Sequence, residues 1–70
     1  MPNESLLTVR EWEVLSAVGF GYTNAQTANR LFASTATIDS HLANIMSKTD
    51  IHDRSELVWQ YQSGKISRDG

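Results

Sequence analysis

The 70-residue sequence contains no cysteine, and its only proline is Pro2. Without cysteine the chain cannot form a disulfide or a thiolate metal site, so the packing of apolar side chains must stabilise the fold. Without a later proline, residues 3–70 lack the residue that most strongly breaks a helix. The four glycines stand at positions 19, 21, 64 and 70, outside the segments with periodic apolar residues. These absences favour an all-α fold.

Long apolar runs and an excess of positive charge are also missing. No apolar run approaches the roughly 20 residues of a membrane-spanning helix, and Met1–Glu4 do not begin a signal-peptide pattern. We therefore expect a soluble, cytoplasmic protein with no membrane partner. Six Lys and Arg residues against eight Asp and Glu residues give a formal net charge of −2. Because neutralisation of phosphates by Lys and Arg supplies most non-specific affinity for nucleic acid, this charge counts against strong non-specific DNA binding.

Residues 1–70 have room for a single domain with a small core. Glu11 and Gln26 each stand three positions after a threonine, which is the spacing of a capping box at a helix start. Residues 62–70 are expected to form a frayed tail. Four residues are expected to cap the starts of four helices: Thr8, Thr23, Ser34 and Asp53.

The two middle helices predict a helix-turn-helix motif. A short helix is expected after Thr23, and a break at residues 32–34 separates it from a longer helix over about residues 35–48. In the longer helix, apolar residues recur at the spacing of one helix face, and the opposite face carries small or short polar residues. The apolar stripe consists of Ile38, Leu42, Ile45 and Met46.

Glu11 lies at the centre of an otherwise apolar stripe in the first helix, which includes Val14 and Val18. A buried carboxylate is costly without a cation beside it. Arg54, at the start of the fourth helix, is the best candidate in the sequence for this partner. We therefore predict a structural Glu11–Arg54 ion pair that ties the first helix to the fourth.

With the helices placed, residues 7–59 resemble the LuxR/GerE-type helix-turn-helix, the DNA-binding domain of many bacterial quorum-sensing and response regulators. The resemblance runs through residues 7–59 without a gap. The matching residues are Leu7-Thr8, Arg10-Glu11, Glu13-Val14-Leu15, Gly21, Thr23-Asn24, Ala28, Leu31-Phe32, Ser34, Thr37-Ile38, His41-Leu42, Asn44-Ile45-Met46, Lys48, Ile51, Arg54 and Glu56-Leu57-Val58.

The resemblance implies an all-α, four-helix domain whose third helix enters the major groove of double-stranded DNA. It implies that Asp39, Ser40 and Ala43 face the bases, where Asp39 can accept from a cytosine amino group. It also implies a homodimer on a two-fold DNA site, with an interface on the fourth helix. For that interface we expect Ser55, Trp59 and Gln62. The residues expected near phosphates are Thr23, Arg30, Thr35, Thr37, Asn44 and Lys48.

Two alternatives remain open at this point. The polar face of the third helix can simply be hydrated, and Trp59 can cover the small core instead of contacting a partner. Asp39 stands where the family very often has lysine, so a protein-interaction module with reduced or lost DNA binding, which pairs with a related regulator protein, is a second hypothesis. In the core, the resemblance shows smaller or more polar residues at positions 27, 33, 49 and 50 than the family usually has.

Enzymatic and metal-binding functions are disfavoured. Asp39, Ser40 and His41 include the residue types of a hydrolytic triad, but neighbours on a helix point about 100° apart and cannot converge. Asp50, His52 and Asp53 offer too few ligands for a convincing metal site. We therefore expect no catalytic residues, no metal and no cofactor.

Overall fold

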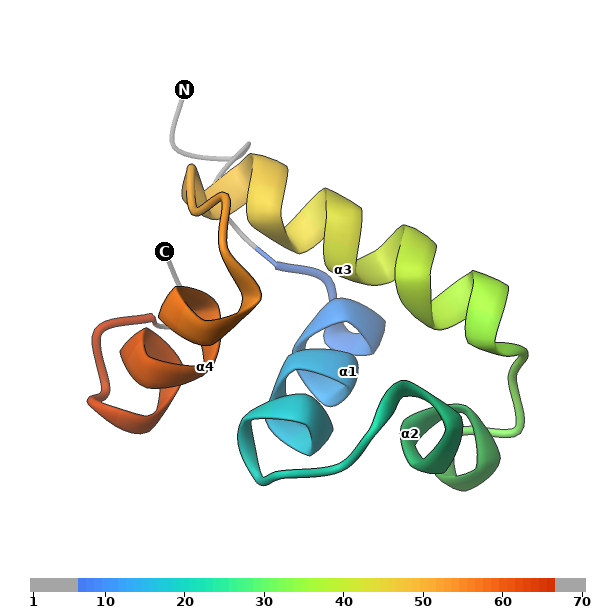
Figure 1. Ribbon diagram of the computed structural model, residues 1–70. Helices are drawn as coiled ribbons and strands as arrows, with labels where there is room; N and C mark the ends of the chain where they lie inside the picture. Colours follow the sequence, from blue (N-terminus) through green and yellow to red (C-terminus); the bar gives the residue numbers. More distant parts are fainter. Residues whose placement is uncertain (1–6, 67–70) are drawn as a thin grey trace.

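The computed structural model describes residues 7–66, which form four helices and no strand (Figure 1). The predicted all-α, four-helix arrangement is therefore confirmed. None of the described helices is long and apolar enough to cross a membrane. The helices are α1 (Val9–Gly19), α2 (Asn24–Arg30), α3 (Thr35–Thr49) and α4 (Arg54–Gln62).

Side-chain caps begin all four helices where the sequence places them. The Thr8 and Thr23 hydroxyls each accept from the backbone N–H three residues on, and the side chains of Glu11 and Gln26 accept the threonine N–H groups in return. Both capping boxes are therefore confirmed. The predicted caps of α3 and α4 each accept one backbone N–H. Because these contacts join residues two or three positions apart, they fix the helix starts locally.

The centre of the fold is α1, which packs against each of the other three helices (Figure 1). In addition, α2 packs against α3 to form the helix-turn-helix. Burying these apolar side chains supplies the main favourable term in folding. The buried apolar residues are Leu7, Val14, Leu15, Val18, Ala28, Ile38, Leu42, Ile45, Ile51 and Leu57.

Two non-glycine residues at helix ends have a left-handed backbone. Phe32, in the turn between α2 and α3, has φ of 55°, and its side chain is 97% exposed. Asp50 has φ of 58° and ends α3. Glycine is the usual residue at such a helix end, because it adopts this conformation without steric cost. Asp50 is tolerated here because Asp adopts the left-handed region more readily than most residues.

The end of α4 and the residues after it contact the rest of the fold. Gln62 is the last residue of α4, and its side-chain Nε2 donates to the carbonyl oxygen of Gly19 at 2.8 Å. The Lys65 N–H donates to the Gln60 carbonyl, and Ile66 packs against the core. Residues 62–66 therefore contact α1 and α4, and fraying of the tail stays a prediction; residues 67–70 lie outside the described part of the chain.

Gly19 allows α1 and α4 to approach closely. A Cβ atom at Gly19 would lie 2.3 Å from Cδ2 of Tyr61. The Tyr61 ring also packs against the Trp12 ring, with 5.5 Å between the two centroids. Trp12 is partly buried, and its ring forms part of the contact between α1 and α4.

Candidate nucleic-acid interface

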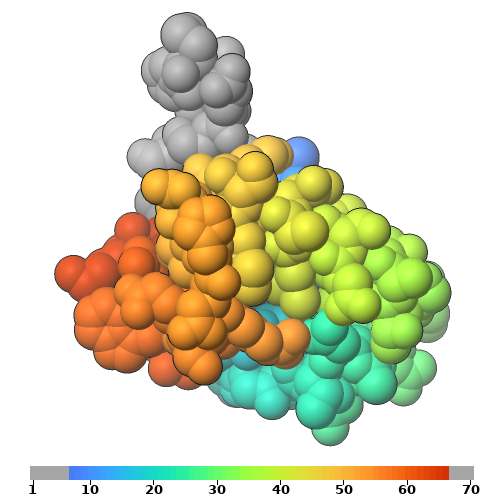
Figure 2. Space-filling view, turned by 45° about the horizontal axis from the view of Figure 1, so that its top comes forward, coloured from blue at the N-terminus to red at the C-terminus, as the bar shows by residue number. Residues whose placement is uncertain are grey.

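The outer face of α3, the longest described helix, is left open by the fold. Ile38, Leu42 and Ile45 point into the core, so the residues between them face outward. Figure 2 shows α3 (yellow to green) running along one face of the molecule, with α2 (blue-green) and the start of α4 (orange) on the same face. The exposed residues on this helix include Thr35, Ala36, Thr37, Asp39, Ser40, Ala43, Asn44 and Ser47.

These side chains are short, which suits close contact with a grooved partner. An α-helix fits the major groove of DNA, which is about 12 Å wide, only if its outer side chains do not hold it away. Asp39, Ser40 and Ala43, the residues expected to face bases, are all exposed. The structure thus leaves these three accessible, and their contact with bases remains a prediction.

Asp39 is held by a hydrogen-bond chain that crosses three helices. Asn24, the first residue of α2, donates from Nδ2 to Oδ1 of Asp39 at 2.6 Å. Arg54, the first residue of α4, donates from Nη1 to Oδ1 of Asn24, also at 2.6 Å. The predicted Glu11–Arg54 pair is therefore wrong, because the Arg54 guanidinium is directed at Asn24. The sequence gives little sign of this role for Asn24, whose helix-start position alone suggests only capping chemistry.

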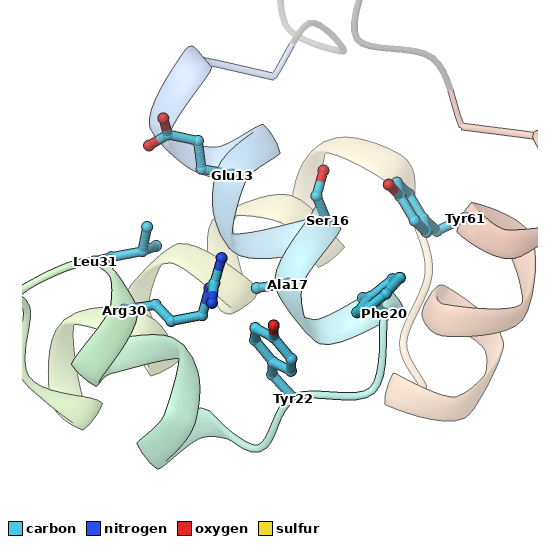
Figure 3. Close-up of a pocket in the computed structure, with 8 residues that line it drawn as sticks. All are labelled: Glu13, Ser16, Ala17, Phe20, Tyr22, Arg30, Leu31 and Tyr61. Carbon is cyan, nitrogen blue, oxygen red and sulfur yellow. The ribbon is translucent and has the colours of Figure 1, made fainter.

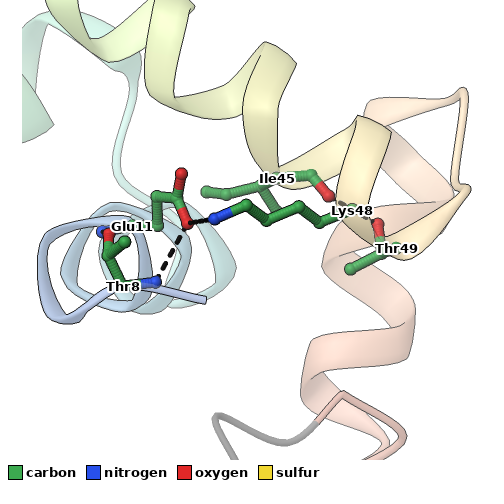
Figure 4. A network of polar contacts seen from close by, with 5 residues as sticks. All are labelled: Thr8, Glu11, Ile45, Lys48 and Thr49. Carbon is green, nitrogen blue, oxygen red and sulfur yellow. Dashed lines mark hydrogen bonds and ion pairs between the residues drawn. The ribbon is translucent and has the colours of Figure 1, made fainter. Parts of the chain in front are cut away.

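Glu11 instead pairs with Lys48, in the last turn of α3. Lys48 Nζ lies 2.7 Å from Glu11 Oε1, which also accepts the Thr8 N–H at 3.0 Å (Figure 4). Burial raises the pKa of Glu11, but the hydrogen bonds from Lys48 and Thr8 and the charge of Lys48 outweigh it and hold the pKa below its usual value. The carboxylate is thus ionised at neutral pH and serves as a structural group.

This ion pair also changes the expected position of Lys48. The sequence predicts Lys48 near DNA phosphates, but its ammonium group is directed inward at Glu11, and only 28% of the side chain is exposed. The Lys48–phosphate prediction therefore conflicts with the structure. The physical reason is that the buried carboxylate attracts the nearest cation that can reach it, and the end of α3 lies against the start of α1.

The other residues expected near phosphates lie on the surface, and several have contacts within the protein. Thr23 caps α2. Thr37 shares a 3.0 Å hydrogen bond between its hydroxyl and that of Ser34. The Arg30 guanidinium lies 4.9 Å from the centroid of the Tyr22 ring. Thr35 and Asn44 are exposed.

The α4 residues expected at a partner interface are all exposed. Trp59 is 53% exposed, a large apolar surface for a domain of this size, and Ser55 lies on the exposed part of the first turn. Lys65 Nζ lies 5.7 Å from the centroid of the Trp59 ring. Gln62 is exposed, although its side-chain amide binds Gly19. An interface here remains a prediction.

A shallow pocket opens between α1, α2 and α4, on a part of the surface that the sequence does not single out (Figure 3). It has a volume of about 440 Å³, and its lining includes three aromatic rings: Phe20 and Tyr22 from the turn between α1 and α2, and Tyr61 from α4. No sequence spacing predicts it, because Tyr61 faces the other two rings only when α4 packs against α1. The lining residues are Glu13, Ser16, Ala17, Phe20, Tyr22, Arg30, Leu31 and Tyr61.

The acidic and histidine residues after α3 do not gather as metal ligands. His52 Nε2 lies 3.2 Å from Oδ1 of Asp50, and both side chains are exposed. Asp53 caps α4 by accepting from Ser55 N–H. Within residues 7–66, no three His, Asp or Glu side chains are grouped so that they could hold a metal ion.

Comparison with known proteins gives the following matches. Residues 5–60 match the family model described as "Bacterial regulatory proteins, luxR family". The chain is 43% identical over 58 residues to the transcriptional regulatory protein LnrK of Bacillus subtilis, covering 81% of this chain and 26% of LnrK. It is also 43% identical over 58 residues to the HTH-type transcriptional regulator MalT of Yersinia pestis, covering 83% of this chain and 6% of MalT. No solved structure matches the chain.

Proposed function

The chain belongs to the LuxR family of bacterial regulatory proteins, and on this basis we propose that it binds double-stranded DNA in transcription regulation. The observation that carries the proposal is the outer face of α3, which is exposed, free of large side chains and adjacent to α2 in a helix-turn-helix. Helix-turn-helix domains commonly insert their second helix into the major groove, and we propose that α3 binds there. The named relatives are transcriptional regulators, which agrees with this role.

In the proposed complex, Asp39, Ser40 and Ala43 face base edges. Short side chains at these positions permit close approach, and Ala43 offers a methyl group for a thymine methyl. Thr23, Arg30, Thr35, Thr37 and Asn44 lie on the surrounding surface and contact phosphates. Lys48 is left out of this set because its ammonium group binds Glu11.

We further propose that two copies pair through α4 on a two-fold DNA site. Ser55, Trp59 and Gln62 are exposed on this helix. Aromatic residues such as Trp59 are frequent at the energetic centres of interfaces. A C₂ dimer would present its two α3 helices to half-sites about one helical turn of DNA apart.

A second candidate function is a protein-interaction module that pairs with a related regulator and binds DNA weakly or not at all. The observation that favours this function is that the described cationic side chains are paired within the protein and not left free for DNA. Besides the net charge of −2, every Lys and Arg side chain in residues 7–66 already has a partner within the protein. These contacts are Arg10 with Glu13, Arg30 with Tyr22, Lys48 with Glu11, Arg54 with Asn24, and Lys65 with Trp59.

Titration and selection with random-sequence duplex DNA at low and moderate salt would test the two functions. DNA binding through α3 predicts retention of duplexes that share a palindromic motif. Ala43→Glu, which places a carboxylate on the outer face of α3, should abolish retention, whereas Val9→Glu, at a 56% exposed position on α1, should not. A folded protein that retains no duplex at low salt would contradict DNA binding and favour the protein-interaction module.

A further inference from the structure

The hydrogen-bond chain from Arg54 through Asn24 to Asp39 has only one possible direction. A guanidinium group only donates hydrogen bonds, and an ionised carboxylate only accepts them. The Asn24 amide between them must therefore turn its carbonyl oxygen to Arg54 and its NH₂ group to Asp39, as the two 2.6 Å contacts show. Both bonds are charge-assisted, which makes them stronger than bonds between neutral groups.

The Arg54–Asn24–Asp39 hydrogen bonds use only one of the two carboxylate oxygens of Asp39. Oδ1 accepts from Asn24, while Oδ2 accepts no hydrogen bond from residues 7–66. Asp39 is exposed on the outer face of α3, so this second oxygen is accessible to a partner. Asn24 and Arg54 are the first residues of α2 and α4, so rigid elements on two sides hold the other oxygen.

From this arrangement we propose that Asp39 selects a cytosine in each DNA half-site, and that Asn24 and Arg54 are the residues that position it. This inference rests on the proposed binding of α3 in the major groove. Cytosine presents an N4 amino donor there, which suits the open carboxylate oxygen. Adenine also presents an amino group, but its N7 acceptor lies beside it and repels a carboxylate, whereas guanine and thymine present acceptors.

An acidic residue in a DNA groove meets two unfavourable effects, and the hydrogen bonds from Arg54 through Asn24 to Asp39 reduce both. First, the positive charge of Arg54, passed through the polarised Asn24 amide, partly offsets the repulsion between Asp39 and the phosphates. Second, a carboxylate already held in one orientation loses less conformational freedom on binding than a mobile one. Asn24 and Arg54 therefore contribute to base selection without touching a base.

The test is selection from random duplexes, followed by affinity measurements on the selected site and on sites changed at each position. The wild-type protein should prefer cytosine at one position of each half-site. Asp39→Asn should change the preferred base from cytosine to adenine, because asparagine can form two hydrogen bonds with N6 and N7 of adenine. Asn24→Ala and Arg54→Met should each reduce the preference for cytosine by about tenfold at that position. Arg54→Lys should keep the preference for cytosine, because Arg54 donates to Asn24 through a single atom, Nη1, and lysine can also donate one such hydrogen bond.

The controls separate positioning from stability. Glu13→Gln breaks an exposed ion pair in α1 and should leave the preference unchanged. If Asn24 and Arg54 acted only on the fold, their variants would lose affinity equally for every sequence, and this result would overturn the positioning role. Asp39→Asn changes an exposed side chain, so it tests cytosine selection even if Asn24→Ala is unstable. Wild-type binding to a motif without the cytosine preference overturns this inference alone, whereas no binding to any duplex overturns it together with the proposed function.

Discussion

Lys48 and Glu11 are 37 positions apart in the chain, yet their side chains meet at 2.7 Å and join the end of α3 to the start of α1. Glu11 is 5% exposed and accepts from both Lys48 Nζ and Thr8 N–H. The pair thus satisfies a buried carboxylate that would otherwise be costly. It also orients α3 relative to the centre of the fold, and through α3 the surface proposed for DNA.

The first prediction concerns the loss of the Lys48 charge. Lys48→Met should lower the free energy of unfolding by about 2 kcal/mol, because it leaves the buried Glu11 carboxylate without its cation. Urea denaturation followed by circular dichroism measures this change. Glu13→Gln is the matched control: it breaks the half-exposed Arg10–Glu13 pair and should cost less than about 0.5 kcal/mol. Equal effects of the two variants would contradict a structural role for the buried pair.

The second prediction is an acid dependence of stability that arises at Glu11. Its pKa in the folded protein is below its value of about 4.3 in an unfolded chain. A depressed carboxylate pKa means that the stabilisation is present above the unfolded pKa and is lost as the pH falls through the folded pKa. Urea midpoints measured from pH 7 down to pH 3 should therefore fall more steeply for the wild-type protein than for Glu11→Gln. Parallel curves for the two proteins would show that other carboxylates govern acid unfolding.

The contrast between the helix caps and the Glu11 pair shows which features the sequence can predict. Thr8 and Thr23 bond to residues three positions away, so their chemistry is visible in the sequence alone. The partner of Glu11 depends on which helix ends meet after packing. Arg54 and Lys48 are both cations on helices that contact α1, and only the structure shows that the end of α3, rather than the start of α4, reaches the carboxylate.

In the candidate DNA surface, too, local features were predictable from the sequence and contacts between helices were not. The exposed face of α3 was predictable, because Ile38 and Ile45 mark its buried side and the period of the helix assigns the rest. The contact between Asn24 and Asp39 was not, because it depends on the angle at which α2 crosses α3. The aromatic pocket was missed for a similar reason: Tyr22 and Tyr61 come together only in the folded chain.

The third prediction concerns Thr27, which is fully buried in α2. Its Oγ1 atom has no hydrogen-bond partner in the described residues. Thr27→Val removes this unsatisfied hydroxyl while keeping the shape of the side chain, so it should stabilise the domain by about 1 kcal/mol. A thermal melt should show an increase in Tm of about 4–8 °C.

Thr49→Val is the control for that experiment. The Thr49 hydroxyl donates to the Ile45 carbonyl at 2.8 Å, so its removal should leave stability unchanged or lower it. A lower Tm for Thr27→Val would show that the Thr27 hydroxyl is satisfied in solution, for example by a buried water molecule.

The fourth prediction tests the close approach of α1 and α4 at Gly19. Gly19→Ala should destabilise the domain by about 2 kcal/mol, because the new Cβ would overlap the Tyr61 ring, which packs against Trp12. In a Tyr61→Ala background this cost should largely disappear, because no ring then occupies the place of the new Cβ. Denaturation of the four proteins in this double-mutant cycle gives the coupling directly. An unchanged cost in the Tyr61→Ala background would place the strain elsewhere.

The last prediction uses charge to locate the DNA on the domain. Asp39→Lys and Glu13→Lys each change the net charge from −2 to 0, but the first lies on the outer face of α3 and the second in the pocket beside α1. If α3 contacts DNA, Asp39→Lys should raise non-specific affinity, and the slope of log K against log salt should become steeper by about one unit per domain. Glu13→Lys should change both quantities little, because Coulomb interactions away from the interface are screened at moderate salt. Equal gains from the two variants would mean that net charge alone attracts the DNA, and the protein-interaction module would then account better for the open face of α3.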